Sequence, residues 1–442
     1  MALVSLALRR DPADVLTALA GEPGAFLLSV PDPVRPATLV GCRPIEELCM
    51  ADDASHPLAR AAEFVARTPP LDATLPFPLG GGVVGYLAYE AGRATAPRAR
   101  RHACPVPLAV LRRYDPVLVF DHTTHQWTLV SGTAARARAP WLERLTSVSP
   151  ASERPFAGAS LRAVWEADRH RNAVGRIREY LAAGDAYQVN LTQPFVASLP
   201  VPACALFARL ARLHPVPYGA YLDCGEFQIV ANSPELLLRR RARRLETRPV
   251  KGTRPRGAEP AADAAQAEAL LASPKDRAEH VMIVDLERND LGRVCETGSV
   301  AVERLLALES HPTVHHLVSI VTGRVAAGVD LATILAAIFP GGSITGAPKV
   351  RAMEIIAELE DAARGVYTGA FGLFDPRGDL ELALPIRTAV VQGGLVTYHA
   401  GGGIVADSDP DSELAECWTK TAALRRALDP TRETPVAQCS SG

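Results

Sequence analysis

Residues 367–399 read YTGAFGLFDPRGDLELALPIRTAVVQGGLVTYH, and this stretch decides the fold class. Its apolar runs are Tyr367–Phe374, Leu380–Val391 and Leu395–His399, and they are separated by Asp-Pro-Arg-Gly and Gln-Gly-Gly. Gly, Pro and Asp between such runs are typical of tight turns that join antiparallel strands. The stretch therefore predicts a meander of antiparallel strands.

Elsewhere in the chain, strands and helices occur in separate blocks. Strand-like runs are Ala25–Val30, Val83–Tyr89, Pro116–Phe120, Trp127–Val130, Ala186–Val196 and Tyr218–Leu238. Helices are predicted over Val164–Ala183, Pro274–Asn289, Ala347–Leu359 and Asp411–Leu428. Because strands follow strands rather than alternating one by one with helices, we expect an α+β fold with a large antiparallel sheet, and not a doubly wound fold.

Composition suggests where the chain divides. Residues 131 to 159 are rich in Ala, Arg, Ser and Pro, which indicates a connection with a short helical piece. We therefore predict an amino-terminal subdomain at residues 1–135, a connecting segment at 136–159 and a carboxy-terminal domain at 160–430. The polar tail at 431–442 is expected to be loose.

The overall composition excludes several classes of protein. The chain has 442 residues, of which 48% are apolar, and a formal net charge of -2. This balance gives no general attraction to nucleic acid or to an anionic membrane, and no run of apolar residues is long enough to span a bilayer. Eight scattered cysteines without a C-x-x-C motif suit a reducing compartment, so we expect a cytoplasmic protein that binds neither nucleic acid nor membrane.

A run of arginines between residues 239 and 256 is the one segment that could suggest RNA binding. No aromatic residue is interleaved for base stacking, and Glu235 and Glu246 lie beside or within the run. We interpret the run as a solvated hairpin.

Lysine is rare, and each lysine is therefore a candidate for chemistry that only an amine performs. Of 47 basic residues, four are lysines: Lys251, Lys275, Lys349 and Lys420. Lys251 lies in Thr247–Thr253, where Pro249 and Gly252 predict an ordered bend. A desolvated lysine on such a bend can act as a neutral nucleophile, whereas an exposed one would be an ordinary surface residue.

Two predicted helices carry acidic pairs. Glu413, Glu416 and Lys420 share one face of the last helix, and Asp276 and Glu279 are one turn apart on an earlier helix. The Glu416–Lys420 spacing also fits a surface ion pair. If the two helices face each other, their carboxylates could hold a hard cation such as Mg²⁺, which takes one or two carboxylates and completes its shell with water and substrate.

Two glycine-rich segments remain open to two interpretations. Gly341–Lys349 leads into a predicted helix and could form an anion site, although it lacks the Walker A pattern. Ala400–Ile404 contains three glycines after a predicted strand. Each segment could equally be a tight turn.

Taken in order, these motifs resemble the chorismate-utilising enzymes, a family that includes the first components of anthranilate synthase and aminodeoxychorismate synthase and the isochorismate and salicylate synthases. The resemblance covers residues 160 to about 428. It implies a sandwich of large antiparallel sheets flanked by helices, with two intertwined subdomains. The matching segments are Ala186–Leu191, Asn232–Glu235, Arg248–Thr253, Asp276–His280, Asp285–Asp290, Thr313–His316, Phe339–Lys349, His399–Val405 and Ser412–Glu416.

Two positions distinguish the members of the family. Isochorismate and salicylate synthases carry a lysine base where Gln188 stands, and anthranilate synthases carry alanine where Lys251 stands. Lys251 is typical of aminodeoxychorismate synthase component I, which makes 4-amino-4-deoxychorismate for p-aminobenzoate and folate biosynthesis. The resemblance leaves anthranilate synthase component I as the alternative.

The resemblance also implies roles for individual residues. Lys251 would form a covalent intermediate with chorismate, and Glu235 would protonate the departing hydroxyl. Glu279 and Glu416 would bind Mg²⁺, supported by Asp276 and Glu413. The residues expected to bind substrate are Gln188, Gly252, Thr253, His316, Tyr367, Arg387, Gly401, Gly403 and Lys420.

The family also implies a partner. Amination requires ammonia, and the chain has no cysteine nucleophile in a glutaminase setting. We therefore expect a separate glutamine amidotransferase subunit to supply ammonia.

Overall fold

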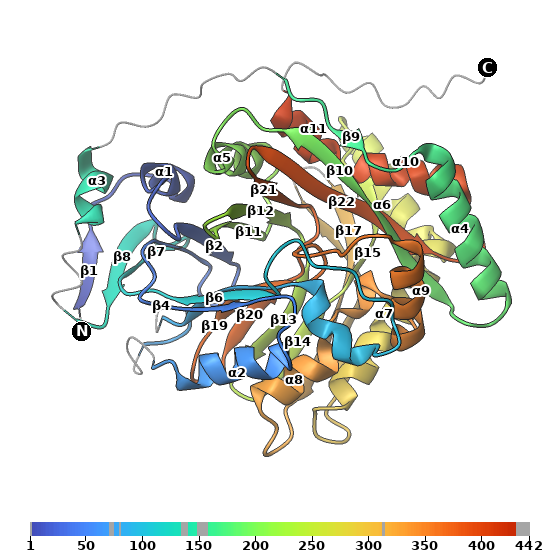
Figure 1. Ribbon diagram of the computed structural model, residues 1–442, viewed down its shortest axis with the longest axis horizontal. Coiled ribbons are helices and arrows are strands. Elements are labelled where there is room, and N and C mark those ends of the chain that lie inside the picture. The colour runs from blue at the N-terminus through green and yellow to red at the C-terminus, as the bar shows by residue number, and fades with distance from the viewer. Residues whose placement is uncertain are drawn as a thin grey trace.

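The computed structural model describes residues 2–69, 75–78, 81–133, 140–147, 158–311 and 314–429. Two large antiparallel sheets, of 12 and ten strands, pack face to face between layers of helices (Figure 1). The predicted fold class is therefore confirmed. The predicted loose tail lies outside the described residues.

The 12-stranded sheet, called sheet A here, contains strands from both ends of the chain. Its strand order is β1-β8-β7-β3-β2-β11-β12-β21-β22-β10-β18, with β9 paired to β10. The strands are β1 (Ala2–Leu6), β2 (Phe26–Val30), β3 (Ala37–Gly41), β7 (Val117–Asp121), β8 (Gln126–Ser131), β9 (Arg162–Ala163), β10 (Gln188–Ser198), β11 (Tyr218–Asp223), β12 (Phe227–Ser233), β18 (Gly346–Ala347), β21 (Thr388–Gln392) and β22 (Leu395–Ile404).

The ten-stranded sheet, called sheet B, is mixed in the same way. Its order is β15-β17-β14-β13-β20-β19-β5-β6-β4, with β16 paired to β17. The strands are β4 (Glu46–Met50), β5 (Val83–Leu87), β6 (Ala109–Arg113), β13 (Leu236–Arg241), β14 (Arg244–Arg248), β15 (Val250–Pro255), β16 (Ala301–Ser310), β17 (Val314–Arg324), β19 (Ala370–Phe374) and β20 (Leu380–Ala383).

Helices cover the outer face of each sheet. Apolar side chains of α1, α5 and α11 pack on sheet A, and those of α2, α7 and α8 pack on sheet B. Helices α4 and α9 pack on β10, near one end of sheet A. The helices are α1 (Pro12–Ala18), α2 (Pro57–Arg67), α3 (Trp141–Ser147), α4 (Ala167–Ala182), α5 (Ala203–Leu213), α6 (Pro260–Ala272), α7 (Pro274–Gly292), α8 (Leu331–Ile338), α9 (Lys349–Leu359), α10 (Pro410–Lys420) and α11 (Ala422–Leu428), with 3-10 segments η1 (Tyr89–Thr95) and η3 (Gly342–Ile344).

The space between the sheets is filled by apolar residues from both of them. Tyr86 of β5 in sheet B meets Phe227 of β12 in sheet A edge to face, with ring centres 6.1 Å apart. Such aromatic pairs add about 0.5–1.5 kcal/mol beyond the area they bury. The inner faces of the two sheets therefore share one core and are shielded from solvent.

The predicted meander proves to be divided between the two sheets. Tyr367–Phe374 contains β19, but the run Leu380–Val391 contains two strands: β20 lies in sheet B and β21 lies in sheet A. The chain crosses between sheets at residues 384–387, where Pro385 cannot donate a ladder hydrogen bond and Arg387 adopts a positive φ of 51°. The prediction of one continuous strand over Leu380–Val391 was therefore wrong.

The arginine run forms the predicted hairpin, β13–β14, but part of it is not solvated. Arg239 is only 5% exposed, and its guanidinium contacts Glu381 at 2.6 Å and Glu246 at 2.8 Å. Arg241 pairs with Asp32 at 2.7 Å. These arginines are therefore structural ion-pair partners. The sequence pattern did not distinguish them from solvated arginines.

Candidate active site

Lys251 lies on β15 beside an irregularity in the sheet. The pairing of β15 with β17 shifts between Lys251 and Thr253, and the intervening Gly252 has a φ of +81°. A Cβ at Gly252 would lie 2.9 Å from Leu270 Cδ1 and 3.3 Å from Asp276 Cβ. Only glycine fits this bulge, which brings α7 against the strand and sets the direction of the Lys251 side chain.

Glu235 lies between β12 and β13 and is buried. Its Oε1 accepts a hydrogen bond of 2.7 Å from the Ser343 hydroxyl. Burial raises the pKa of Glu235 to about 7, against the opposing effects of the Ser343 hydrogen bond and the charge of Lys251. A carboxyl group with this pKa is about half protonated at neutral pH and can serve as a general acid.

The acidic pairs of α7 and α10 approach the same region from two sides. A Cβ at Gly402 of β22 would lie 3.2 Å from Glu413 Oε2 and 3.3 Å from Glu416 Oε1. Burial has the largest effect on Glu279 of α7 and raises the pKa of its carboxyl group. The charge of Glu413 adds to this increase. The two helices therefore place Glu279 and Glu413 within electrostatic reach of one another.

Lys420 forms the ion pair with Glu416 that their four-residue spacing allows, and it makes a second contact as well. Its Nζ lies 2.6 Å from Glu416 Oε1 and donates to the Gly401 carbonyl oxygen at 2.6 Å. The carboxylate of Asp276 accepts a hydrogen bond of 2.8 Å from Arg254. Asp276 is therefore already paired with Arg254, and its charge adds to the raised pKa of Glu279.

Electrostatic effects join Lys251 to Glu235 and to charged groups of α7 and α10. Burial lowers the pKa of Lys251; the charge of Glu279 opposes this shift, and that of Lys420 adds to it. The net pKa is below the ordinary value of a lysine. The residue as a whole is nevertheless partly exposed. An amine in this setting is a stronger nucleophile at neutral pH than a solvated lysine.

A buried side-chain amide that lacks hydrogen-bond partners in the described part of the chain lies on the neighbouring part of sheet A. Gln188 is completely buried, and neither atom of its side-chain amide has a hydrogen-bond partner within the described residues. A Cβ at Gly403 would lie 2.7 Å from the Gln188 side-chain nitrogen. Buried amides are rarely left without partners, so Gln188 is suited to receive a polar ligand at the glycine-rich part of β22.

Of the other predicted substrate residues, Thr253 and His316 lie on β15 and β17 of sheet B, whereas Tyr367 and Arg387 lie outside the strands. The Thr253 hydroxyl and His316 Nδ1 are 2.8 Å apart, and burial lowers the pKa of His316 to about 3, with Arg387 contributing. Arg387 has no carboxylate partner among the described residues, and burial lowers its pKa. Tyr367 lies against His399, with ring centres 5.2 Å apart. Arg387 is therefore available to pair with a ligand carboxylate.

The comparisons with known proteins agree with this arrangement. The family model described as chorismate binding enzyme matches residues 24–426. The chain belongs to the chorismate-binding enzyme family. Among its relatives, aminodeoxychorismate synthase component 1 of Bacillus subtilis is 40% identical over 80% of this chain and 78% of the relative. Anthranilate synthase component 1 of Streptomyces coelicolor is also 40% identical, over 95% of this chain and 86% of the relative.

Solved structures of chorismate-binding enzymes share the fold. Anthranilate synthase component I from Streptococcus pneumoniae superposes with a TM-score of 0.79 at 28% identity, covering 89% of this chain and 93% of the other. Relatives of two activities thus match at similar identity. Overall similarity therefore assigns the family, and individual residues must decide between its members.

The residues of this chorismate-binding enzyme are compatible with a magnesium ion. Within the described residues, no three His, Cys, Asp or Glu side chains gather into a ready-made metal site. Mg²⁺ does not require such a group, because one or two carboxylates suffice when substrate and water complete the shell. Glu279 and Glu416 offer hard oxygen donors from two facing helices, and Gly402 leaves the space beside Glu416 open.

The structure refines the interpretation of one glycine-rich segment and corrects that of the other. Gly341–Lys349 leads into helix α9 as predicted, and within the segment lie η3 and β18, where Ala347 pairs with Gln188. The Lys349 amine forms a buried ion pair with Asp290. The glycines of Ala400–Ile404 lie within β22 and not in a turn, because a Cβ at Gly401 would lie 1.9 Å from the Leu191 carbonyl oxygen of β10.

Two further residues belong to this site, and the sequence analysis assigned no role to either, although both lie in segments that match the family. Ser343 reaches Glu235 from 108 positions away in the chain. Glu287 of α7 is buried, and burial raises its pKa to about 8, with Asp290 adding to the shift. Glu287 lies about three helical turns beyond Asp276 and about two beyond Glu279, and this spacing is the hint that the sequence provides.

None of the described helices has the length and apolar character needed to cross a membrane.

Proposed function

We propose that the protein is an aminodeoxychorismate synthase component I, which converts chorismate and ammonia into 4-amino-4-deoxychorismate. The observation that supports this proposal best is Lys251, an amine of lowered pKa whose charge interacts with that of Glu235 and with the acids of α7 and α10. Among members of the family, a lysine at this position is typical of that activity.

In the first step, the neutral Lys251 amine adds to C2 of the chorismate ring. The ring double bonds shift, and the C4–O bond breaks. Glu235 gives its proton to the departing C4 hydroxyl, so that water leaves. The pKa of about 7 allows Glu235 to hold this proton under neutral conditions.

In the second step, ammonia adds to C4. The double bonds shift back, and the bond between C2 and the Lys251 nitrogen breaks. The amine is then free for another turnover, and the enolpyruvyl group stays attached to the product.

Binding groups hold the two carboxylates of the substrate during both steps. Mg²⁺, held by Glu279 and Glu416 with Asp276 and Glu413 close by, would supply positive charge at the ring carboxylate. Arg387 is suited to a bidentate contact with a carboxylate, and Lys420 brings a second cation to the glycine-rich part of β22. Gln188, Thr253, His316, Tyr367 and the backbone at Gly252, Gly401 and Gly403 would complete the substrate contacts.

Ammonia would come from a separate glutamine amidotransferase subunit. The relatives named as component 1 imply a second component, and this fits the lack of a glutaminase nucleophile in the chain. The product would serve p-aminobenzoate and folate biosynthesis.

Anthranilate synthase component I is the second candidate, because the Streptomyces coelicolor relative of that name matches 95% of this chain. The two activities differ in the product formed from the same reactants. Incubation of the purified protein with chorismate, Mg²⁺ and ammonium, followed by product mass and ultraviolet spectrum, separates them. We expect 4-amino-4-deoxychorismate; accumulation of anthranilate would overturn the proposal.

A further inference from the structure

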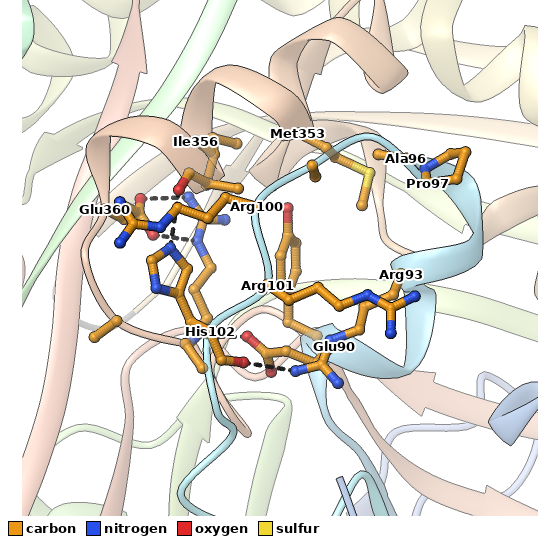
Figure 2. Close-up of a pocket in the computed structure, with 16 residues that line it drawn as sticks. Glu90, Arg93, Ala96, Pro97, Arg100, Arg101, His102, Met353, Ile356 and Glu360 are labelled. Carbon is orange, nitrogen blue, oxygen red and sulfur yellow. Dashed lines mark hydrogen bonds and ion pairs between the residues drawn. The ribbon is translucent and has the colours of Figure 1, made fainter. Parts of the chain in front are cut away.

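A pocket that shares no lining residue with the candidate active site lies between η1 with the segment that follows it and helix α9 (Figure 2). It contains about 580 Å³ of empty space, part of which is open to solvent. None of the residues assigned above to chemistry or substrate binding lines it.

Tyr89 provides the first sign that the pocket is built for a ligand. The residue lines the pocket and is only 9% exposed, yet its hydroxyl has no hydrogen-bond partner within the described residues. Burial raises the pKa of Tyr89, so the hydroxyl keeps its proton and can donate it in a hydrogen bond. Buried tyrosine hydroxyls usually find a partner, and an acceptor in the pocket would supply one.

The charges around the pocket provide the second sign. Its two glutamates are already satisfied: Glu90 accepts from the backbone N–H groups of Arg364 and Gly365, and Glu360 pairs with the Arg364 guanidinium at 2.7 Å. Arg100 and Arg101 are exposed, and neither forms an ion pair with a described residue. The pocket therefore has unpaired positive charge and no free carboxylate to balance it.

Part of the remaining wall is apolar. Met353 and Ile356 project from α9 on one side of the pocket, opposite Arg101 and Glu90 (Figure 2). Pro97 adds a further apolar surface. A fully hydrated ion such as phosphate would gain nothing from this wall, whereas an apolar group would bury surface on it.

We propose that this pocket is a binding site for a small carboxylate with an apolar body. The carboxylate accepts the Tyr89 hydroxyl hydrogen bond and interacts with Arg100 and Arg101 at the mouth. The apolar body packs on Met353 and Ile356. The site is independent of the proposed chemistry at Lys251, so its test does not depend on turnover.

The test uses sodium benzoate as the probe and benzamide as its neutral counterpart. Each is titrated calorimetrically into the full-length protein in the presence of EDTA, so that no metal-bound carboxylate can contribute. Benzoate is expected to bind at a single site, with benzamide at least about tenfold weaker, because a hydrogen bond to a charged group contributes roughly 1.5–3 kcal/mol. Tyr89→Phe is expected to weaken benzoate binding about tenfold for the same reason.

Two variants serve as controls. Arg98→Gln changes an exposed arginine of the same segment that does not line the pocket, and it should leave benzoate binding unchanged. Gln188→Leu removes the unpartnered amide of the candidate active site and should also leave it unchanged.

Folding is a minor concern for Tyr89→Phe, since the change keeps the ring and removes an unsatisfied hydroxyl; thermal melting checks it. Benzoate binding that survives Tyr89→Phe, that is lost in Gln188→Leu, or that equals benzamide binding would overturn the proposal. So would the lack of benzoate binding up to about 10 mM.

Discussion

The Ser343 hydroxyl donates a 2.7 Å hydrogen bond to the buried carboxyl group of Glu235. Ser343 lies in η3, and Glu235 lies where the chain passes from sheet A to sheet B. The bond favours the ionised form of Glu235 and so opposes the effect of burial on its pKa. Ser343 therefore sets the pH range in which the proposed acid keeps its proton.

Replacing Ser343 by alanine should move this range. Loss of a hydrogen bond to the carboxylate raises the pKa of Glu235 above about 7. The alkaline limb of the kcat/KM profile is then expected at higher pH than in the parent protein. Ser299→Ala, a change in a turn outside the site, should leave the profile unmoved. A Ser343→Ala profile that coincides with the parent profile would show that the bond does not tune Glu235.

The pH dependence of amination should show two limbs. Glu235 must be protonated, so the rate should fall as pH rises through about 7. Lys251 must be neutral, so the rate should also fall as pH decreases below its lowered pKa. In Glu235→Gln, kcat should fall about 100-fold or more and the alkaline limb should disappear. Persistence of that limb in the variant would assign it to another group.

Substitution of Lys251 should separate charge from nucleophilicity. Lys251→Arg keeps a positive charge among the acids but cannot supply a neutral amine, so amination should be lost as severely as in Lys251→Ala. Steady-state rates with saturating ammonium make the comparison. Full activity in either variant would rule out the covalent step.

Two adjacent glycines offer a matched test of the metal-binding region. A Cβ at Gly402 would meet only the ends of flexible side chains, those of Glu413, Glu416 and Lys420. Gly402→Ala should therefore fold normally but need a higher Mg²⁺ concentration for half-maximal rate. Gly401→Ala collides with the backbone of β10 and should lower the melting temperature. Unchanged Mg²⁺ dependence in Gly402→Ala would place the metal elsewhere.

Arg239 should be important for stability and not for chemistry. Arg239→Leu removes the most deeply buried partner of Glu381 and Glu246, although Arg241 still pairs with Glu381, and we expect a cost of about 3 kcal/mol in the free energy of unfolding. The exposed pair of Arg288 and Asp285 is the control, because Arg288→Leu should cost less than about 1 kcal/mol. Urea denaturation measures both. If the two variants lost the same free energy of unfolding, the buried ion pairs of Arg239 would contribute no more to stability than an exposed pair.

Local patterns in the sequence predicted most of the strands and helices, because alternation and 3.6-residue spacing report on single elements. They did not show that β20 and β21 belong to different sheets, since a proline and one positive-φ residue do not identify which partner a strand chooses. The last predicted helix likewise divides at Thr421 into α10 and α11.

The candidate site was predicted best where residues lie on one element. Glu413 and Glu416 share a helix face, and their approach to α7 followed from the family resemblance. The contact between Ser343 and Glu235 depends on how two sheets pack, and no spacing in the sequence encodes it. The same holds for Tyr89, whose unpartnered hydroxyl is visible only after folding.

The two sheets combine distant parts of the chain, and this has a consequence for biosynthesis. β2 pairs with β11, and β5 pairs with β19, which begins at Ala370. As the polypeptide leaves the ribosome, β2 must therefore wait with one side unpaired until residues 218–223 of β11 are made, and β5 must wait until late in translation. Exposed strand edges promote aggregation, so we expect the nascent chain to rely on chaperones until its last hundred residues emerge.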